Sequence, residues 1–267
     1  MKITVAIVCS NDHLLRLCLD SIPNGVPIIV VLNFPDKYIE DLVMADDRIT
    51  VVRYDERNLG LLRQIAADAC ETPGILYLDS DSALCDGGIT IVEDELEHYQ
   101  ALSLPIRYKY SDFFSKVVSA CRLFTTPDEM LFMPFAFRLS VQNSIGCLFN
   151  KNLSWGEDSD QRDRLEKAGI CFAISKSRVF HKELSIIEDA RSAMRLGVGA
   201  YIKERNGLSF PRKFMQDLSL VHEIRLFSKC VRRVGLAAGL YHLLVWRPAY
   251  KIGYWLTRKK VRKWTLQ

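Results

Sequence analysis

The chain has 267 residues, of which 49% are hydrophobic and 25% are charged. This composition is that of an ordinary globular protein and excludes a disordered chain. The length predicts one α/β domain with an appendage. The formal net charge of +4 hides an uneven distribution, because residues 225–267 contain eleven Lys or Arg and no Asp or Glu.

The sequence gives no sign of export. MKITVAIVCSND begins with only a short apolar run, which favours a first strand over a signal peptide, and no apolar stretch is long enough to cross a bilayer. The eight cysteines include no Cys-x-x-Cys pair, so a zinc ribbon has no support. We interpret the cysteines as buried thiols of a protein in a reducing compartment, and a disulfide framework is the alternative. We therefore expect a cytoplasmic protein.

The first third of the chain alternates strand-like and helix-like patterns. Strands are expected at 3–9, 26–33, 48–55 and 74–81, with helices at 12–21, 37–44 and 61–70. This alternation predicts a parallel sheet with helices on both faces. In such sheets, ligands bind beyond the carboxyl ends of the strands.

The middle and the end of the chain are less regular. The expected elements are a helix at 89–99, a strand at 101–108, a strand near 144–149 after the aromatic segment 131–140, a charged helix at 158–168 with Leu165 on its inner face, a strand at 169–175, and helices over 186–245 with a break at 207–211.

Two carboxylates end the fourth predicted strand, in the run Ile75-Leu-Tyr-Leu-Asp79-Ser80-Asp81. Because extended side chains alternate, Asp79 and Asp81 are expected on the same side. A hard divalent ion such as Mg²⁺ or Mn²⁺ would relieve their repulsion and could also hold a diphosphate. A solvated turn is the alternative for an isolated Asp-x-Asp.

Two further motifs flank this strand. Asn58 and Gly60, after the third strand, suit a tight turn. Downstream, Trp155-Gly156-Glu157-Asp158 opens the charged helix, where acidic residues favour the helix dipole and could simply cap it. Trp155 could stack on a sugar ring or pack in the core. A carboxylate beside it could remove a proton from a hydroxyl.

The order of these motifs resembles glycosyltransferase family 2, from Ile3 to about His181. The resemblance implies a GT-A (Rossmann-like) fold, which is a mixed α/β sheet flanked by helices. The chain departs from the family pattern in two places. Its second strand ends in Leu32-Asn33, where the family usually has paired acidic residues, and Arg63 lies a couple of residues earlier than the family's arginine.

The resemblance also implies roles for the matching residues. Asp79 and Asp81 would position the nucleotide and its divalent metal, Mn²⁺ or Mg²⁺, and His181 would complete the metal site. Asp158 would be the general base of an inverting transfer. A structural role is the alternative for His181.

On the same grounds, Trp155 and Glu157 would lie beside the acceptor. The donor would be a nucleotide sugar, UDP- or dTDP-linked. Its binding residues, besides the two aspartates of the motif, would be Asn33, Asp55, Asn58 and Arg63.

Residues 225–267 are expected to form a basic, aromatic-rich helical extension to a domain at 1–224. Basic and aromatic residues beside apolar helix faces suit an anionic membrane surface. We therefore expect a peripheral protein on the inner face of the cell membrane, acting on a lipid-linked or surface-polysaccharide acceptor. A helical hairpin packed on the body is the alternative. No nucleic-acid partner is expected, because the body is acidic and no nucleic-acid motif is present.

Two rival functions remain at this stage. One is a degenerate GT-A domain that serves as a non-catalytic membrane adaptor, with Asn33 as the sign of decay. The other is a phosphatase of the haloacid-dehalogenase kind with Asp79 as nucleophile. The position of the motif in the fourth strand, followed by Ser82-Ala83, disfavours the phosphatase.

Overall fold

The computed structural model describes residues 1–125, 133–208 and 220–264, and the side chains at 220 and 259–264 lie outside this description. The chain forms two compact units, Met1–Arg107 with Asp128–Lys182, and Tyr108–Pro127 with Glu183–Gln267. The extension predicted at 225–267 therefore begins inside the second unit.

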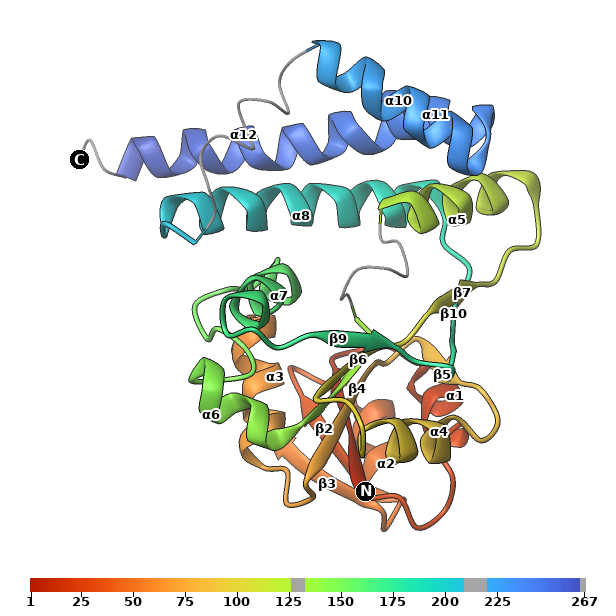
Figure 1. Ribbon diagram of the computed structural model, residues 1–267, viewed down its shortest axis with the longest axis vertical. Helices are drawn as coiled ribbons and strands as arrows, with labels where there is room; N and C mark the ends of the chain where they lie inside the picture. Colours follow the sequence, from red (N-terminus) through yellow and green to blue (C-terminus); the bar gives the residue numbers. More distant parts are fainter. Residues whose placement is uncertain (126–132, 209–219, 265–267) are drawn as a thin grey trace. The chain divides into compact units, whose positions relative to one another are not determined.

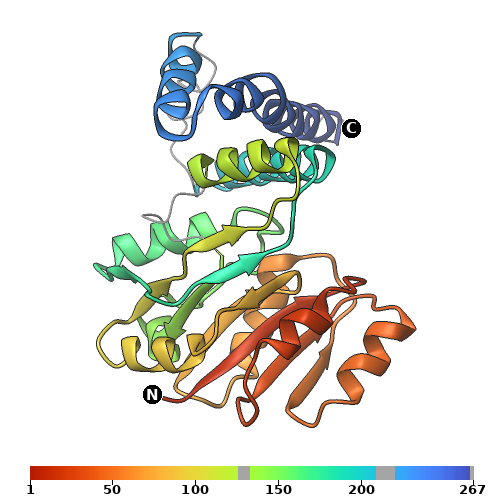
Figure 2. The ribbon, with the colours of Figure 1, turned by 90° about the vertical axis from the view of Figure 1, so that its right-hand side faces the viewer.

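A seven-stranded mixed sheet forms the centre of the first unit, in the order β3-β2-β1-β4-β8-β6-β9 (Figures 1 and 2). The strands are β1 (Ile3–Cys9), β2 (Ile28–Leu32), β3 (Ile49–Arg53), β4 (Gly74–Asp79), β6 (Ala101–Ser103), β8 (Phe135–Arg138) and β9 (Phe172–Ile174). Strands β1 to β4 run parallel, whereas β8 is antiparallel to β4 and β6. The predicted α/β mixed sheet is confirmed.

Helices cover both faces of this sheet because its central strands are apolar on both sides. Val5 and Ile7 point to one face, against α1 (Leu15–Asp20), α2 (Lys37–Met44) and α4 (Gly88–Glu95). The alternate residues, such as Ala6 and Tyr77, point to the other face. There they meet α3 (Leu59–Asp68) and α7 (Glu157–Lys167), including the predicted inner residue Leu165.

The strand predicted at 101–108 is two strands. Leu104 and Pro105 separate β6 from β7 (Ile106–Tyr108), which belongs to a second, three-stranded sheet of order β5-β10-β7. In that sheet β5 (Ser82–Leu84) pairs antiparallel with β10 (Val179–His181), and Ser82 lies opposite His181. Proline lacks the N–H that a continuous strand would use here.

The strand predicted near 144–149 is wrong. The aromatic residues Phe135–Arg138 form the strand instead, as β8. The chain then turns into a 3₁₀ helix (Leu139–Val141) and α6 (Gln142–Ile145). Because Phe135 and Phe137 are fully buried, β8 fills the core, and the apolar residues Leu148 and Phe149 pack beside it from a loop. Part of the predicted segment, 131–132, lies outside the described residues.

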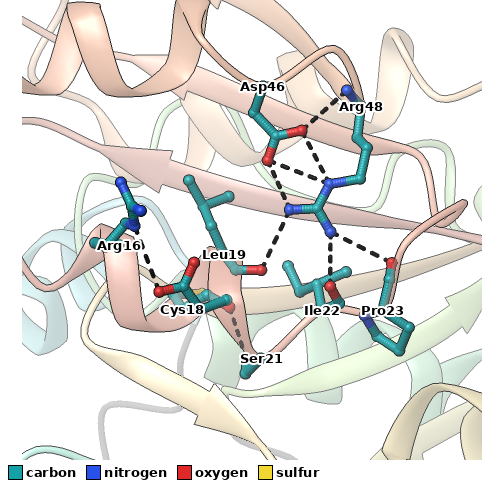
Figure 3. A network of polar contacts seen from close by, with 9 residues as sticks. Arg16, Cys18, Leu19, Ser21, Ile22, Pro23, Asp46 and Arg48 are labelled. Carbon is teal, nitrogen blue, oxygen red and sulfur yellow. Dashed lines mark hydrogen bonds and ion pairs between the residues drawn. The ribbon is translucent and has the colours of Figure 1, made fainter.

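The connections at the amino ends of the strands are held by a charged cluster, shown in Figure 3. Arg48 donates to both carboxylate oxygens of Asp46, at 2.9 Å from Nε to Oδ1 and 2.6 Å from Nη2 to Oδ2. It also donates to the carbonyls of Ile22, Pro23 and Leu19. We call this the Arg48 clamp. It joins the connection before β2 to the connection before β3.

The second unit is helical. Its helices are α5 (Phe113–Thr125), α8 (Ile186–Arg205), α10 (Leu220–Val234), α11 (Leu236–Tyr241), a π-helix η2 (His242–Trp246) and α12 (Arg247–Trp264). A capping box begins α8, with Ser185 and Glu188 bonded reciprocally. Gly207, at φ 67°, follows α8 at the predicted break, and residues 209–211 of that break lie outside the described residues.

Helices α8 and α12 run side by side in close contact. A Cβ at Gly197 would lie 2.0 Å from the Tyr250 carbonyl oxygen, and one at Gly253 would lie 2.0 Å from that of Met194. The two glycines are therefore what lets the backbones approach. Within the described parts of the chain, no helix is both long and apolar enough to cross a membrane.

Candidate functional site

The candidate site lies at the carboxyl end of β4, in the first unit. Asp79 is the last residue of β4, whereas Asp81 stands in the turn that leads to β5. Between them, the Ser80 hydroxyl donates to Oδ2 of Asp12 at 3.0 Å. Asp12 follows β1, the parallel neighbour of β4. Because Asp81 lies in a turn, the strand alternation that was expected to place Asp79 and Asp81 on the same side does not extend to Asp81.

The pairing of β5 with β10 brings His181 to Asp81. Nε2 of His181 lies 3.4 Å from Oδ1 of Asp81, and Nζ of Lys182 lies 3.5 Å from Oδ2. Both side chains of the His181–Asp81 pair are largely buried, at 15% and 17% exposure. Burial raises the pKa of the Asp81 carboxyl, and Asp79 adds to the rise, although His181 and Lys182 oppose it.

The contacts of His181 fit a divalent cation. Its Nδ1 lies 3.0 Å from the carbonyl oxygen of Lys182. A carbonyl oxygen accepts, so Nδ1 is the donor in this contact, and Nε2 is the ring nitrogen that lies toward Asp81. A metal-bound histidine is commonly oriented in this way by its second nitrogen. Among the described residues, however, no three His, Cys, Asp or Glu side chains form a ready-made metal cluster.

Asp79 is instead paired with Arg63. The guanidinium of this buried arginine donates to Oδ1 of Asp79 at 3.1 Å and also to Oε1 of Glu157. Its backbone carbonyl accepts from the Tyr77 hydroxyl at 3.1 Å. We call Arg63, Asp79, Glu157 and the adjacent Asp158 the Arg63 cluster. It links α3, β4 and α7.

Negative charge exceeds positive charge in the Arg63 cluster. Burial would lower the pKa of Arg63, but Glu157, Asp79 and Asp158 outweigh burial and raise it. Burial raises the pKa of Glu157 to about 7, against the opposing effect of Arg63 and with the help of Asp158. One guanidinium thus bonds to two carboxylates, those of Asp79 and Glu157.

Asp158 lies in the first turn of α7. Gly156, at φ 77°, is the N-cap, and because glycine has no side chain it makes no capping bond. Oδ1 of Asp158 accepts from the Ser159 amide at 2.7 Å. Asp158 and Trp155 are half-buried, whereas Glu157 is buried against Arg63. Of the two residues predicted beside the acceptor, Trp155 thus reaches solvent, whereas Glu157 accepts a hydrogen bond from Arg63 inside the protein.

Asn58 and Gly60 have a local structural role. Oδ1 of Asn58 caps α3 by accepting from the Leu61 amide at 3.2 Å, and Nδ2 donates to the Lys151 carbonyl at 2.6 Å. A Cβ at Gly60 would lie 2.5 Å from the carbonyl oxygens of Asn150 and Leu153. The motif therefore docks the 150–153 loop on the start of α3, the helix that carries Arg63.

Asn33 and Asp55 join the ends of β2 and β3. Nδ2 of the buried Asn33 donates to the carbonyls of Tyr54 and Glu56 at 2.8 and 2.9 Å. Oδ1 of the exposed Asp55 accepts from the Phe34 amide at 3.3 Å. Phe34 has a φ of 49°, and the Arg57 guanidinium lies 5.6 Å from its ring centroid. Asn33 and Asp55, both predicted to bind the nucleotide sugar, therefore lie at the same edge of the sheet as Asp79.

Sequence analysis missed Asp12 and Lys182, which contact the site. The position of Asp12 just beyond the first strand was the available signal, because carboxyl ends of neighbouring parallel strands converge. Lys182 directly follows His181, but its approach to Asp81 depends on the β5–β10 pairing.

Comparisons with known proteins were made at three levels. No family model matches the chain, and no curated protein sequence matches it. Solved structures do match. The chain shares the fold of TarS. Crystal structures of S. aureus TarS with UDP-GlcNAc and without it both have a TM-score of 0.54 and cover 98% of this chain and 92% of theirs, at 14% and 15% identity.

A longer TarS crystal structure also matches, with a TM-score of 0.54 and 16% identity. It covers 95% of this chain, which spans 54% of that one. At these identities the likeness establishes the fold. The glycosyltransferase family 2 resemblance rests on the sequence motifs, and the roles of the individual residues remain predictions.

Proposed function

We propose that this protein is an inverting glycosyltransferase that moves a sugar from a nucleotide-sugar donor to a hydroxyl group. One observation carries the proposal. His181 lies 3.4 Å from Asp81, two residues beyond Asp79 at the carboxyl end of β4, where such sheets commonly bind ligands, and the fold is shared with TarS, whose crystal structures include complexes with UDP-GlcNAc and UDP. A UDP-linked donor is the first choice on this basis, and a dTDP-linked donor is the second.

Asp81 and His181 would hold a divalent cation, Mn²⁺ or Mg²⁺, which would neutralise the charge on the departing nucleoside diphosphate. Asp79, kept in place by Arg63, would lie beside the donor. Asn33 and Asp55 would contact the base and ribose from the ends of β2 and β3. Arg63 and Asn58 would act by positioning, since their described contacts are within the protein.

Asp158 would be the general base. The acceptor oxygen bonds to the anomeric carbon while the bond from that carbon to the diphosphate oxygen breaks. The acceptor proton passes to the Asp158 carboxylate, and the nucleoside diphosphate leaves with the electron pair. Attack from the face opposite the leaving group inverts the anomeric centre.

The acceptor would be a lipid-linked or surface polysaccharide. Trp155, three residues before Asp158, reaches solvent and would stack on an acceptor sugar. Glu157 would act indirectly, by orienting Arg63 and the first turn of α7. The basic stretch 225–267 would keep the enzyme at the membrane that holds such an acceptor.

Donor binding is tested by a thermal-shift titration of the full chain with UDP and UDP-sugars, with and without Mn²⁺. We expect stabilisation that needs both nucleotide and metal and that Asp81→Asn removes. The matched control is Asp86→Asn, an exposed aspartate a few residues downstream, which should bind as the unaltered protein does. Stabilisation that is unchanged in Asp81→Asn would overturn the assigned site.

The base is tested with Asp158→Asn. We expect kcat to fall by about 10²–10⁴-fold, the usual contribution of a general base, with little change in donor affinity. Glu166→Gln, on an exposed position of the same helix, should retain activity. Donor binding without turnover in the unaltered chain would favour the adaptor, and phosphate release from a phosphomonoester would favour the phosphatase.

A further inference from the structure

One exposed face of the second unit carries a row of large apolar side chains. They lie 38–68% exposed along the helical segment that begins with α11 and continues through η2 into α12: Leu236, Leu240, Leu244, Ile252, Trp255 and Leu256. We call these six residues the apolar stripe. Pro248, also exposed, occupies the step between Leu244 and Ile252.

The opposite side of the same helical segment is already packed. Tyr241 is buried and donates to the buried Asp189 of α8 at 2.7 Å. Trp246 is buried, and Gly253 meets the backbone of α8 at Met194. The apolar stripe is therefore a second face that the core of this unit does not use.

The π-helix keeps the stripe together. Residues spaced by four drift around an α-helix by about 40° at each step, because one turn takes 3.6 residues. In η2 the i→i+5 hydrogen bonds widen the turn, so that four residues complete less than one full turn. The π-helix η2 lies midway between Leu236 and Ile252. Its wider turn offsets the drift, so that Ile252, Trp255 and Leu256 lie on the same side of the helical segment as Leu236 and Leu240.

The surroundings of the stripe are basic. From Arg225 to the end of the sequence there are eleven Lys or Arg and no acidic residue. The last acid before it, Glu223, is buried between Arg247 at 2.8 Å and Lys251 at 2.7 Å. At one end of the stripe the Arg258 guanidinium lies 5.0 Å from the Trp255 ring. Neighbouring α10 exposes Arg225, Lys229 and Arg232.

We propose that the apolar stripe docks on an anionic lipid bilayer, with the helical segment lying in the plane of the headgroups. Apolar side chains would enter the acyl boundary, Trp255 would sit at headgroup depth, and the basic residues would face lipid phosphates. A second copy of this chain is a poorer occupant, because it would bring like charges together. The apolar stripe would bind the bilayer whether or not the chain transfers a sugar.

The test is co-sedimentation of the full chain with vesicles of phosphatidylcholine, with and without phosphatidylserine. The stripe variant is Leu240→Gln/Leu244→Gln/Ile252→Gln. The control variant is Leu17→Gln/Met44→Gln/Ile187→Gln, which removes three exposed apolar residues elsewhere that are 57–67% exposed, against 43–68% for the three stripe residues. We expect binding that requires phosphatidylserine, weakens by about tenfold or more in the stripe variant and stays unchanged in the control.

Three results would overturn the proposal. They are an unaltered chain that stays in the supernatant, equal binding of the stripe and control variants, and equal binding to vesicles without phosphatidylserine. A dimer in light scattering that only the stripe variant dissociates, together with no vesicle binding, would assign the stripe to self-association.

A second measurement needs no substitution in the stripe. Brominated lipid in the same vesicles should quench tryptophan fluorescence of the unaltered protein, because Trp255 would lie at headgroup depth, next to the acyl chains. The Trp255→Phe variant should lose most of that quenching. An unquenched signal in vesicle-bound protein would show that another face makes the contact.

Discussion

The first unit contains two arginine clusters at opposite ends of its strands, and they differ in charge balance. In the Arg48 clamp, one guanidinium meets one carboxylate, and the remaining donors go to backbone carbonyls. In the Arg63 cluster, one buried guanidinium donates to two carboxylates, those of Asp79 and Glu157. We therefore expect the Arg48 clamp to serve the fold alone, and the Arg63 cluster to serve both the fold and the proposed donor site.

The largest difference is expected from removing each arginine. Arg63→Met leaves the buried Glu157 without its partner, so we expect a loss of about 3–5 kcal/mol in unfolding free energy, measured by urea denaturation, together with loss of donor binding. Arg63→Met/Glu157→Met should recover stability but not donor binding. Full donor binding in either variant would show that the Arg63 cluster is structural only.

Arg48→Met should behave differently. Its carbonyl and carboxylate partners are partly solvated, so water can replace the lost bonds, and we expect about 1–3 kcal/mol of destabilisation. Donor binding and turnover, measured at a temperature where the variant is folded, should match those of the unaltered protein. A selective loss of turnover would mean that the two ends of the sheet are coupled.

A smaller effect is expected from Asn58→Ala, which removes the N-cap of the helix that carries Arg63. The expected cost is about 0.5–2 kcal/mol in unfolding free energy. Asn58→Asp and Asn58→Ser retain a capping oxygen and should cost less, even though they lose the bond to the Lys151 carbonyl. If Asn58→Ser caps the helix but abolishes donor binding, Asn58 contacts the donor directly.

The pH dependence of stability also distinguishes the two clusters. The raised pKa of Glu157, about 7 against 4.5 for the ordinary group, means that the folded state holds the proton more tightly. Stability should therefore fall as pH rises across that interval, and Glu157→Gln should remove this slope. Arg48 lowers the pKa of Asp46 below 3.8, so its contribution should be lost only as pH falls below that value. Urea denaturation across this pH range, with Asp46→Asn as the comparison variant, measures both slopes.

Local pattern predicted most of the elements in the first unit. The strand at 3–9 and the helix at 37–44 were predicted with their observed bounds. The apolar run of the strand and the Asp36 cap of the helix are short-range signals. The prediction failed in the aromatic segment, whose residues suit a strand or a loop. Burial of Phe135 and Phe137 placed the strand at Phe135–Arg138, before the strand predicted near 144–149. It also failed at Pro105, where the chain passes from one sheet to the other.

The sequence by itself determined which residue types stand at the carboxyl ends of the strands, because apolar periodicity sets those ends. Tertiary structure alone decided their partners. Arg63 reaches Glu157 across 94 positions of sequence, and His181 reaches Asp81 through the antiparallel β5–β10 pair. The apolar stripe likewise appeared only with the fold, because a helix shows which face is uncovered once its neighbours are packed against the other. Short-range periodicity fixes elements, whereas charge balance and exposure depend on chain segments far apart in sequence.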